Sequence, residues 1–124
     1  MHELSVTESL LALTLQHAQA AQAQHVTGVH VVIGQLSSVI DESVQFYWDL
    51  IASGTMAEGA RLHFRRVPAT FRCVDCGHTF GLSSDTLDCP ACHSLRIKLA
   101  AGEELYLEAL DIEPATVWLK ECAA

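Results

Sequence analysis

Four of the five cysteines stand in two close pairs, and their spacing is the strongest chemical signal in the sequence. Cys73 and Cys76 bound the segment CVDC, and after 12 intervening residues Cys89 and Cys92 bound CPAC. Each pair can present two thiolates to one ion, and two such pairs complete the tetrahedron of sulfurs that Zn(II) prefers. We therefore predict a zinc site whose four ligand positions are filled, which makes the metal structural and leaves no place for a catalytic water.

Alternatives to the zinc site are weaker. A redox Cys-x-x-Cys motif is the main one, but two pairs without a thioredoxin-like strand–helix–strand context count against it. Disulfides are disfavoured because no export signal precedes the domain and reducing compartments keep thiols free. His78 and His93 follow the two pairs. We expect them to be exposed turn residues, although either could replace a thiolate as a ligand, and we expect Cys122 to be a bystander.

The first three residues, Met1, His2 and Glu3, form a second group with metal-binding chemistry. The terminal amine, the deprotonated amide of His2 and its imidazole Nδ1 can close two fused chelate rings on one ion, in a roughly planar arrangement. Ni(II) and Cu(II) prefer nitrogen donors in a plane, whereas Zn(II) prefers tetrahedral thiolates. The fourth position is left to Glu3, another side chain or water. By itself the pattern is a weak signal, because any histidine at position two offers it.

Two helices are predicted from capping and periodicity. A capping box formed by Ser5 and Glu8 favours a first helix from about Ser5 to Gln24. The second helix starts at the acidic residues of DESVQFYWDLIASGT, which suit a helix N-terminus, and ends near Gly54. The buried faces are expected to contain Leu4, Leu11, Leu15 and Ala18 in the first helix, and Val44, Tyr47, Trp48 and Ile51 in the second.

Three segments have the composition and alternation of strands, namely 26–34, 61–67 and 103–113. We predict an α+β fold in which two helices pack on this three-stranded sheet, with a four-cysteine zinc ribbon inserted before the last strand. The ribbon would occupy 69–101. The remaining domain would be discontinuous, covering 1–68 and 102–113, and 114–124 would be a tail whose Trp118 and Leu119 pack on the body.

Charge narrows the possible partners. The chain has 7 Lys+Arg against 15 Asp+Glu and a formal net charge of −8, which disfavours phosphate backbones and membrane surfaces. Because zinc ribbons are common in transcription machinery, a nucleic-acid-binding ribbon is the main alternative function. The basic residues of 69–101 are balanced by acidic ones: Arg72, Arg96 and Lys98 against Asp75, Asp85 and Asp88. A structural adaptor that binds no nickel is a third possibility.

Other classes receive no support from the sequence. A zincin helix would need histidine at position 6, which is Val6, and no phosphate-binding G-x-x-x-x-G-K-[ST] loop is present. We therefore expect that the protein is not an enzyme. The absence of an export signal and of a long apolar run, together with reduced cysteines, predicts a cytoplasmic protein.

Several segments in this order resemble the HypA/HybF family of hydrogenase nickel-incorporation proteins: MHELS, VTGVHVVIGQLSSV, ESVQFYWDL, GTMAEGARLHF, CVDC, CPAC and GEELYLEALDIE. The resemblance covers about residues 1–113. It implies a metallochaperone that helps deliver nickel to the [NiFe]-hydrogenase large subunit with a HypB-type GTPase, and in some organisms a role in urease maturation. It also implies nickel ligands at Met1, His2 and Glu3, and zinc ligands at the four paired cysteines. The segment after Glu113 is longer than the family pattern.

Overall fold

The computed structural model describes residues 3–81, 88–113 and 116–122, with side chains in the last segment up to Leu119. It confirms the α+β class. The elements follow one another as α1 (Glu3–Ala20), β1 (Val26–Gly34), α2 (Asp41–Ile51), β2 (Arg61–Val67), β3 (Thr70–Cys73), β4 (Thr79–Gly81), β5 (Ile97–Ala101), β6 (Leu105–Ile112) and β7 (Thr116–Cys122).

The chain divides into two compact units. The helix-sheet unit combines three segments, Met1–Val32, Ser38–Arg65 and Leu105–Ala124. The ribbon unit combines Ile33–Ser37 with Arg66–Glu104. No helix among the described residues is both long and apolar enough to cross a bilayer.

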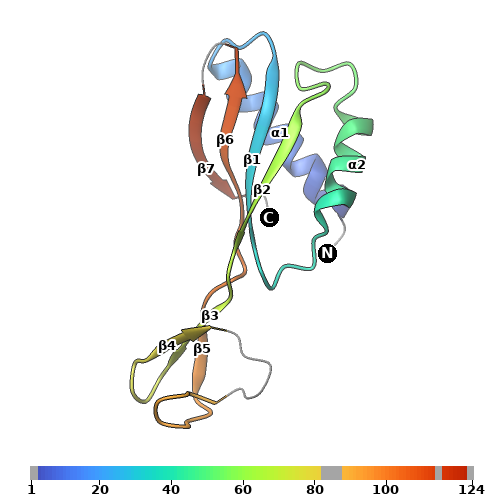
Figure 1. Ribbon diagram of the computed structural model, residues 1–124. Coiled ribbons are helices and arrows are strands. Elements are labelled where there is room, and N and C mark those ends of the chain that lie inside the picture. The colour runs from blue at the N-terminus through green and yellow to red at the C-terminus, as the bar shows by residue number, and fades with distance from the viewer. Residues whose placement is uncertain (1–2, 82–87, 114–115, 123–124) are drawn as a thin grey trace. The chain divides into compact units, whose positions relative to one another are not determined.

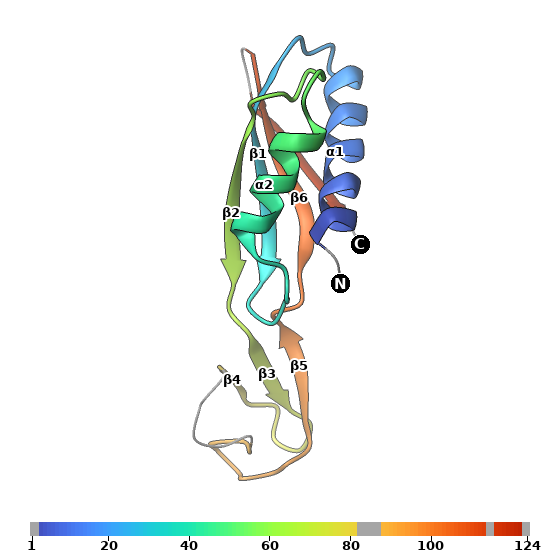
Figure 2. The ribbon, with the colours of Figure 1, turned by 90° about the vertical axis from the view of Figure 1, so that its right-hand side faces the viewer.

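In the helix-sheet unit, both helices lie on the same side of a sheet with the strand order β2-β1-β6-β7 (Figures 1 and 2). The three predicted strands are therefore neighbours, but the sheet has a fourth strand. β7 pairs antiparallel with β6, from Asp111 opposite Thr116 to Tyr106 opposite Cys122. The side chain of Trp118 is 73% exposed, so the expectation that it packs on the body is wrong, while Leu119 is half-buried. Alternation along β7 places these two neighbours on opposite sides of the strand.

The first helix differs from its prediction in both position and orientation. It begins at Glu3 rather than Ser5 and ends at Ala20, four residues before Gln24. Gln22 follows in the left-handed region with φ 58°, which a helix cannot continue through. Leu4 is 40% exposed, and Leu11 and Leu15 are half-buried. The buried face contains Ala18, as predicted, but its other members are Val6, Thr7, Leu10 and Thr14 rather than the three leucines.

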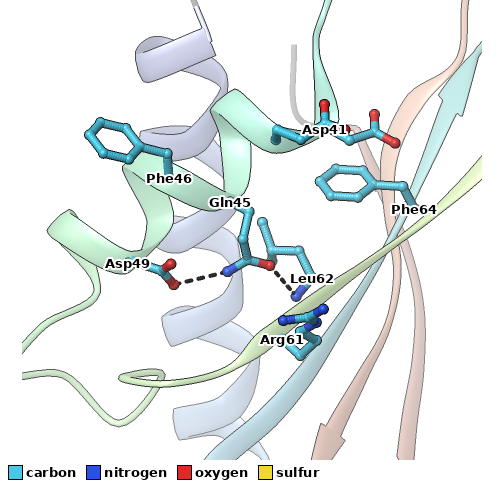
Figure 3. Close-up of a pocket in the computed structure, with 8 residues that line it drawn as sticks. Asp41, Gln45, Phe46, Asp49, Arg61, Leu62 and Phe64 are labelled. Atoms are coloured by element: carbon cyan, nitrogen blue, oxygen red, sulfur yellow. Dashed lines mark hydrogen bonds between the residues drawn. The ribbon is translucent and has the colours of Figure 1, made fainter.

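The second helix matches its predicted face, because Val44 and Trp48 are fully buried. It also anchors β2, one of the two edge strands of the sheet. The side-chain carbonyl of Gln45 accepts a 3.0 Å hydrogen bond from the backbone N–H of Leu62, and its amide donates to Asp49 (Figure 3). This contact satisfies a backbone donor on an edge strand. An open groove runs beside it, lined by Asp41, Glu42, Gln45, Phe46, Asp49, Arg61, Leu62 and Phe64.

The ribbon unit contains a three-stranded antiparallel sheet in the order β4-β3-β5. The turn after β1 contacts the other segment of this unit. The N–H of Gly34 donates to the carbonyl of Glu104 at 2.7 Å, and the N–H of Leu36 donates to the carbonyl of Gly102 at 2.8 Å. A Cβ on Gly34 would collide with the backbone of Gly102, so the close approach requires glycine.

Candidate metal centre

The structure brings the four predicted zinc ligands together in the ribbon unit. Their sulfurs all lie within 4.8 Å of one another. The closest distances join the two pairs, at 3.5 Å between Cys73 and Cys92 and 3.6 Å between Cys76 and Cys89. A tetrahedron with Zn–S bonds of about 2.3 Å has sulfurs about 3.8 Å apart. The donor set and its spacing therefore fit one tetrahedral ion with thiolate ligands.

Two backbone turns of the same design present these sulfurs. In the first, the N–H of Gly77 donates to the carbonyl of Cys73; in the second, the N–H of His93 donates to the carbonyl of Cys89. Gly77 has φ 77° and His93 has φ 61°, so each pair is followed by a residue in the left-handed region. His93 thus occupies the position that glycine occupies in the first turn.

The electrostatic interactions among the four thiols favour the binding of a cation. The N–H of Cys76 lowers the pKa of the Cys73 thiol to about 7, against the effect of burial. At Cys92 the N–H of Ser94 favours the thiolate, but the Cys73 sulfur and burial outweigh it and raise the pKa to about 12. Once one thiol ionises, neighbouring sulfurs resist ionisation because like charges repel. A divalent ion would remove that resistance, since metal binding deprotonates coordinating thiols.

The two histidines beside the cluster are exposed, in agreement with the turn interpretation. His93 Nδ1 lies 3.1 Å from an Asp88 carboxylate oxygen, and His78 stacks on Phe80 with ring centroids 6.1 Å apart. Asp75 pairs with Arg96 at 3.1 Å and accepts a hydrogen bond from the hydroxyl of Ser94. The contacts of Asp75 with Arg96 and Ser94 therefore connect the first turn to the second.

The predicted nickel ligands Met1 and His2 lie outside the described residues. Glu3 is the first residue of α1 and is half-buried. Its carbonyl accepts a hydrogen bond from the Thr7 hydroxyl, which holds the first turn of the helix. The helix therefore starts directly after the two residues that would supply the nitrogen donors.

A third group of potential ligands was not predicted. His30, His63 and Asp111 offer two imidazole nitrogens and a carboxylate oxygen within 4.8 Å of one another. They come from β1, β2 and β6, which are far apart in sequence and adjacent in the sheet. The only signal in the sequence was a histidine in each of two strand segments, VTGVHVVIG and RLHFRRV.

Residues 1–112 match the model of a family described as hydrogenase/urease nickel incorporation, metallochaperone, HypA. The chain belongs to the HypA family. It is 40% identical over 113 residues to a hydrogenase maturation factor HypA of Dehalococcoides mccartyi, which covers 91% of this chain and 95% of the relative. It is 41% identical over 114 residues to HypA of Caldanaerobacter subterraneus, which covers 91% and 100%. HybF of Salmonella typhimurium is 34% identical over 113 residues, covering 91% and 100%.

Solved structures of the family agree with the fold. A solution structure of the Ni metallochaperone HypA from Helicobacter pylori matches with a TM-score of 0.64 at 29% identity, over 90% of this chain and 97% of that one. A second solution structure of a HypA protein matches with a TM-score of 0.70 at 30% identity, covering 90% and 96%. The chain is therefore a member of a family of nickel-incorporation metallochaperones, and its resemblance in sequence extends to its fold.

Proposed function

We propose that this protein binds Ni(II) at its N-terminus and helps to insert it into [NiFe]-hydrogenase during maturation. The observation that carries the proposal is the match over residues 1–112 to a family of nickel-incorporation metallochaperones, a range that includes the predicted ligands Met1, His2 and Glu3. Nickel is the cargo. Its ligands are the amine of Met1, the amide and imidazole of His2, and Glu3 or another group in the fourth position.

The four clustered cysteines hold a structural Zn(II) in this proposal. Four sulfurs at near-tetrahedral spacing support zinc, because soft thiolates in that geometry select it over Ni(II). The two metals are thus sorted by ligand type and geometry. A filled shell of four thiolates supplies no open position, so the zinc contributes to folding rather than to reactivity.

The protein works as a carrier without catalysing a reaction, and we assign it to the cytoplasm, where reduced cysteines persist. Its partners in this proposal are a HypB-type GTPase and the hydrogenase large subunit, with urease maturation proteins where the organism has them. Transfer to a partner requires exchangeable ligands. A ligand from the acceptor protein can bind nickel at an open fourth position. Moderate nickel affinity therefore suits transfer better than extreme affinity.

Nickel stoichiometry of untagged, zinc-loaded protein tests the proposal. The His2→Ala variant should lose the terminal nickel while its zinc content and circular dichroism stay unchanged. The matched control is His25→Ala, which removes an exposed histidine from the turn before β1 and should keep that nickel. If both variants bound nickel like the parent, the terminal site would be wrong, and if the parent itself bound no nickel, the structural adaptor would be favoured.

Changes to the terminal amine separate the chelate from simple imidazole binding. A long N-terminal extension converts the amine into a peptide bond, so nickel affinity should fall although His2 and Glu3 remain. One added glycine places the histidine third from the terminus, where four nitrogens fill a square plane and hold nickel more tightly. We expect poor hydrogenase maturation from both, because the first binds nickel only weakly at its terminus and the second does not release it. Equal nickel affinity in all three proteins would show that the amine is not a ligand.

A further inference from the structure

His30, His63 and Asp111 lie together on the face of the sheet that neither helix covers. Alternation along β1 directs Val29 and Val31 towards the helices and His30 away from them, and alternation along β2 separates buried Leu62 from exposed His63. Asp111 reaches the same face from β6. The cluster lies within the helix-sheet unit, and none of its members belongs to the cysteine site or to the terminal motif.

The carboxylate of Asp111 is held in place by several contacts. Its Oδ1 accepts a 2.9 Å hydrogen bond from the hydroxyl of Thr116, and its Oδ2 accepts one of 2.8 Å from Nε2 of His30. A Cβ on Gly28 would lie 2.5 Å from Oδ2, so the missing side chain at this position makes room for the carboxylate. Glycine inside a strand often marks such a close approach.

The geometry is close to that of a metal site. In octahedral coordination with bonds of about 2.1 Å, neighbouring donor atoms lie about 3.0 Å apart. Nε2 of His30 and Oδ2 of Asp111, 2.8 Å apart, already have this spacing. The ring of His63 stacks on that of His30, with centroids 4.8 Å apart and planes 19° from parallel. His63 is exposed on the edge strand β2. Rotation of its side chain would direct one ring nitrogen towards a metal ion bound by His30 and Asp111.

The charge of the surroundings favours a cation. Burial would raise the pKa of Asp111, but the hydrogen bonds from His30 and Thr116 outweigh it and lower the pKa, so the carboxylate is ionised at neutral pH. The chain as a whole carries a formal charge of −8. An ionised carboxylate beside two imidazoles suits borderline first-row ions, with water completing the coordination.

We propose that His30, His63 and Asp111 form a second binding site for a divalent first-row ion, Ni(II) in the first instance, on the open face of the sheet. On binding, Nε2 of His30 exchanges its hydrogen bond with Asp111 for a bond to the metal, and the ring carries its proton on Nδ1. Three protein ligands on an exposed face leave the other positions to water. The site would hold nickel weakly and exchange it readily, independently of the terminal chelate.

Zinc-loaded His2→Ala protein isolates this site, because the cysteines are occupied and the terminal imidazole is removed. Titration with NiCl2 should show one nickel ion bound per protein, in addition to the zinc. His63→Ala should weaken that binding at least about tenfold, whereas the control His25→Ala should not change it. Asp111→Asn should act like His63→Ala. Gly28→Ala retains all three ligands but displaces the carboxylate, and should also weaken the site. Zinc content and circular dichroism establish that each variant is folded.

Spectroscopy distinguishes the two nickel sites when both are occupied in the same protein. Planar nickel with nitrogen donors at the terminus is diamagnetic, whereas six-coordinate nickel bound by histidine, carboxylate and water is paramagnetic. In the parent protein, excess Ni(II) should therefore broaden the NMR signals of His30, His63 and Gly28. The absence of nickel binding by the His2→Ala protein would overturn the proposal, as would equal binding by the His63→Ala and His25→Ala forms. Neither result would depend on whether the terminal motif binds nickel.

Discussion

The two units are stabilised in different ways. In the helix-sheet unit, Trp48, Leu10 and Leu107 lead a set of fully buried apolar side chains contributed by both helices and by the sheet. In the described part of the ribbon unit, the buried apolar residues are Ile33, Ala69, Cys73 and Cys89. Two of those four are metal-ligand candidates. One unit has a core of large apolar side chains, whereas half of the buried apolar residues described in the other are cysteines.

Because of this difference, the fold of only one unit is expected to depend on bound metal. Burial of a large apolar side chain contributes about 1.5–3 kcal/mol, so the helix-sheet unit can fold from its own sequence. The described part of the ribbon unit buries few such residues, and structural zinc supplies about 10–16 kcal/mol of apparent binding free energy in small zinc-binding peptides. The ribbon unit should therefore be folded when zinc is bound and unfolded when zinc is removed, while the helix-sheet unit keeps its fold in both cases.

The largest expected effect is the loss of zinc. Cys89→Ser, or a strong chelator, should unfold the ribbon unit and leave the helix-sheet unit folded. Amide exchange detected by NMR would show it, through loss of protection in the paired residues Arg72 and Lys98 of β3 and β5. Cys122→Ser is the control and should retain zinc. Protected ribbon amides in metal-free protein would mean that the sulfurs are not what holds this unit together.

The converse change removes a core side chain. Trp48 is fully buried, and its replacement by alanine should destabilise the helix-sheet unit by about 3–5 kcal/mol through lost burial and a cavity. Urea unfolding followed by far-ultraviolet circular dichroism measures this change. Trp48→Phe should cost much less, because an aromatic ring still fills most of the space. Zinc stoichiometry should be the same in both variants. A loss of zinc in Trp48→Ala would show that the two units do not fold independently.

The sequence predicted best what depends on local spacing. The paired cysteines converge as expected, because each pair forms its own turn, and β1, β2 and the buried face of α2 follow from short-range alternation or periodicity. The prediction of the buried face of α1 was right at Ala18 but wrong at its three leucines, because leucines are spread around the helix and Val6, Thr7 and Thr14 occupy buried positions. Periodicity is ambiguous when apolar residues lie on more than one face.

Features that depend on tertiary neighbours were missed. The segment of β7 became a strand because β6 offers it an edge, which the sequence of the segment does not reveal. The group of His30, His63 and Asp111 comes from three strands, and its members meet only once the strand order is known. The terminal nickel motif remains a prediction, since Met1 and His2 lie outside the described residues.

The smallest expected effect concerns the two cysteine turns, which share one backbone design but differ in sequence. Gly77 and His93 both have positive φ, a conformation that costs a residue with a Cβ about 1–2 kcal/mol. Gly77→Ala should therefore weaken zinc affinity by about 5- to 30-fold. His93→Gly should relieve the corresponding strain, offset by loss of the exposed contact with Asp88, which contributes about 0–1 kcal/mol. Its zinc affinity should equal or exceed that of the parent. Competition with a chromophoric chelator compares the three proteins. A marked loss of zinc affinity in His93→Gly would identify His93 as more than a turn residue and would revive its alternative role as a metal ligand.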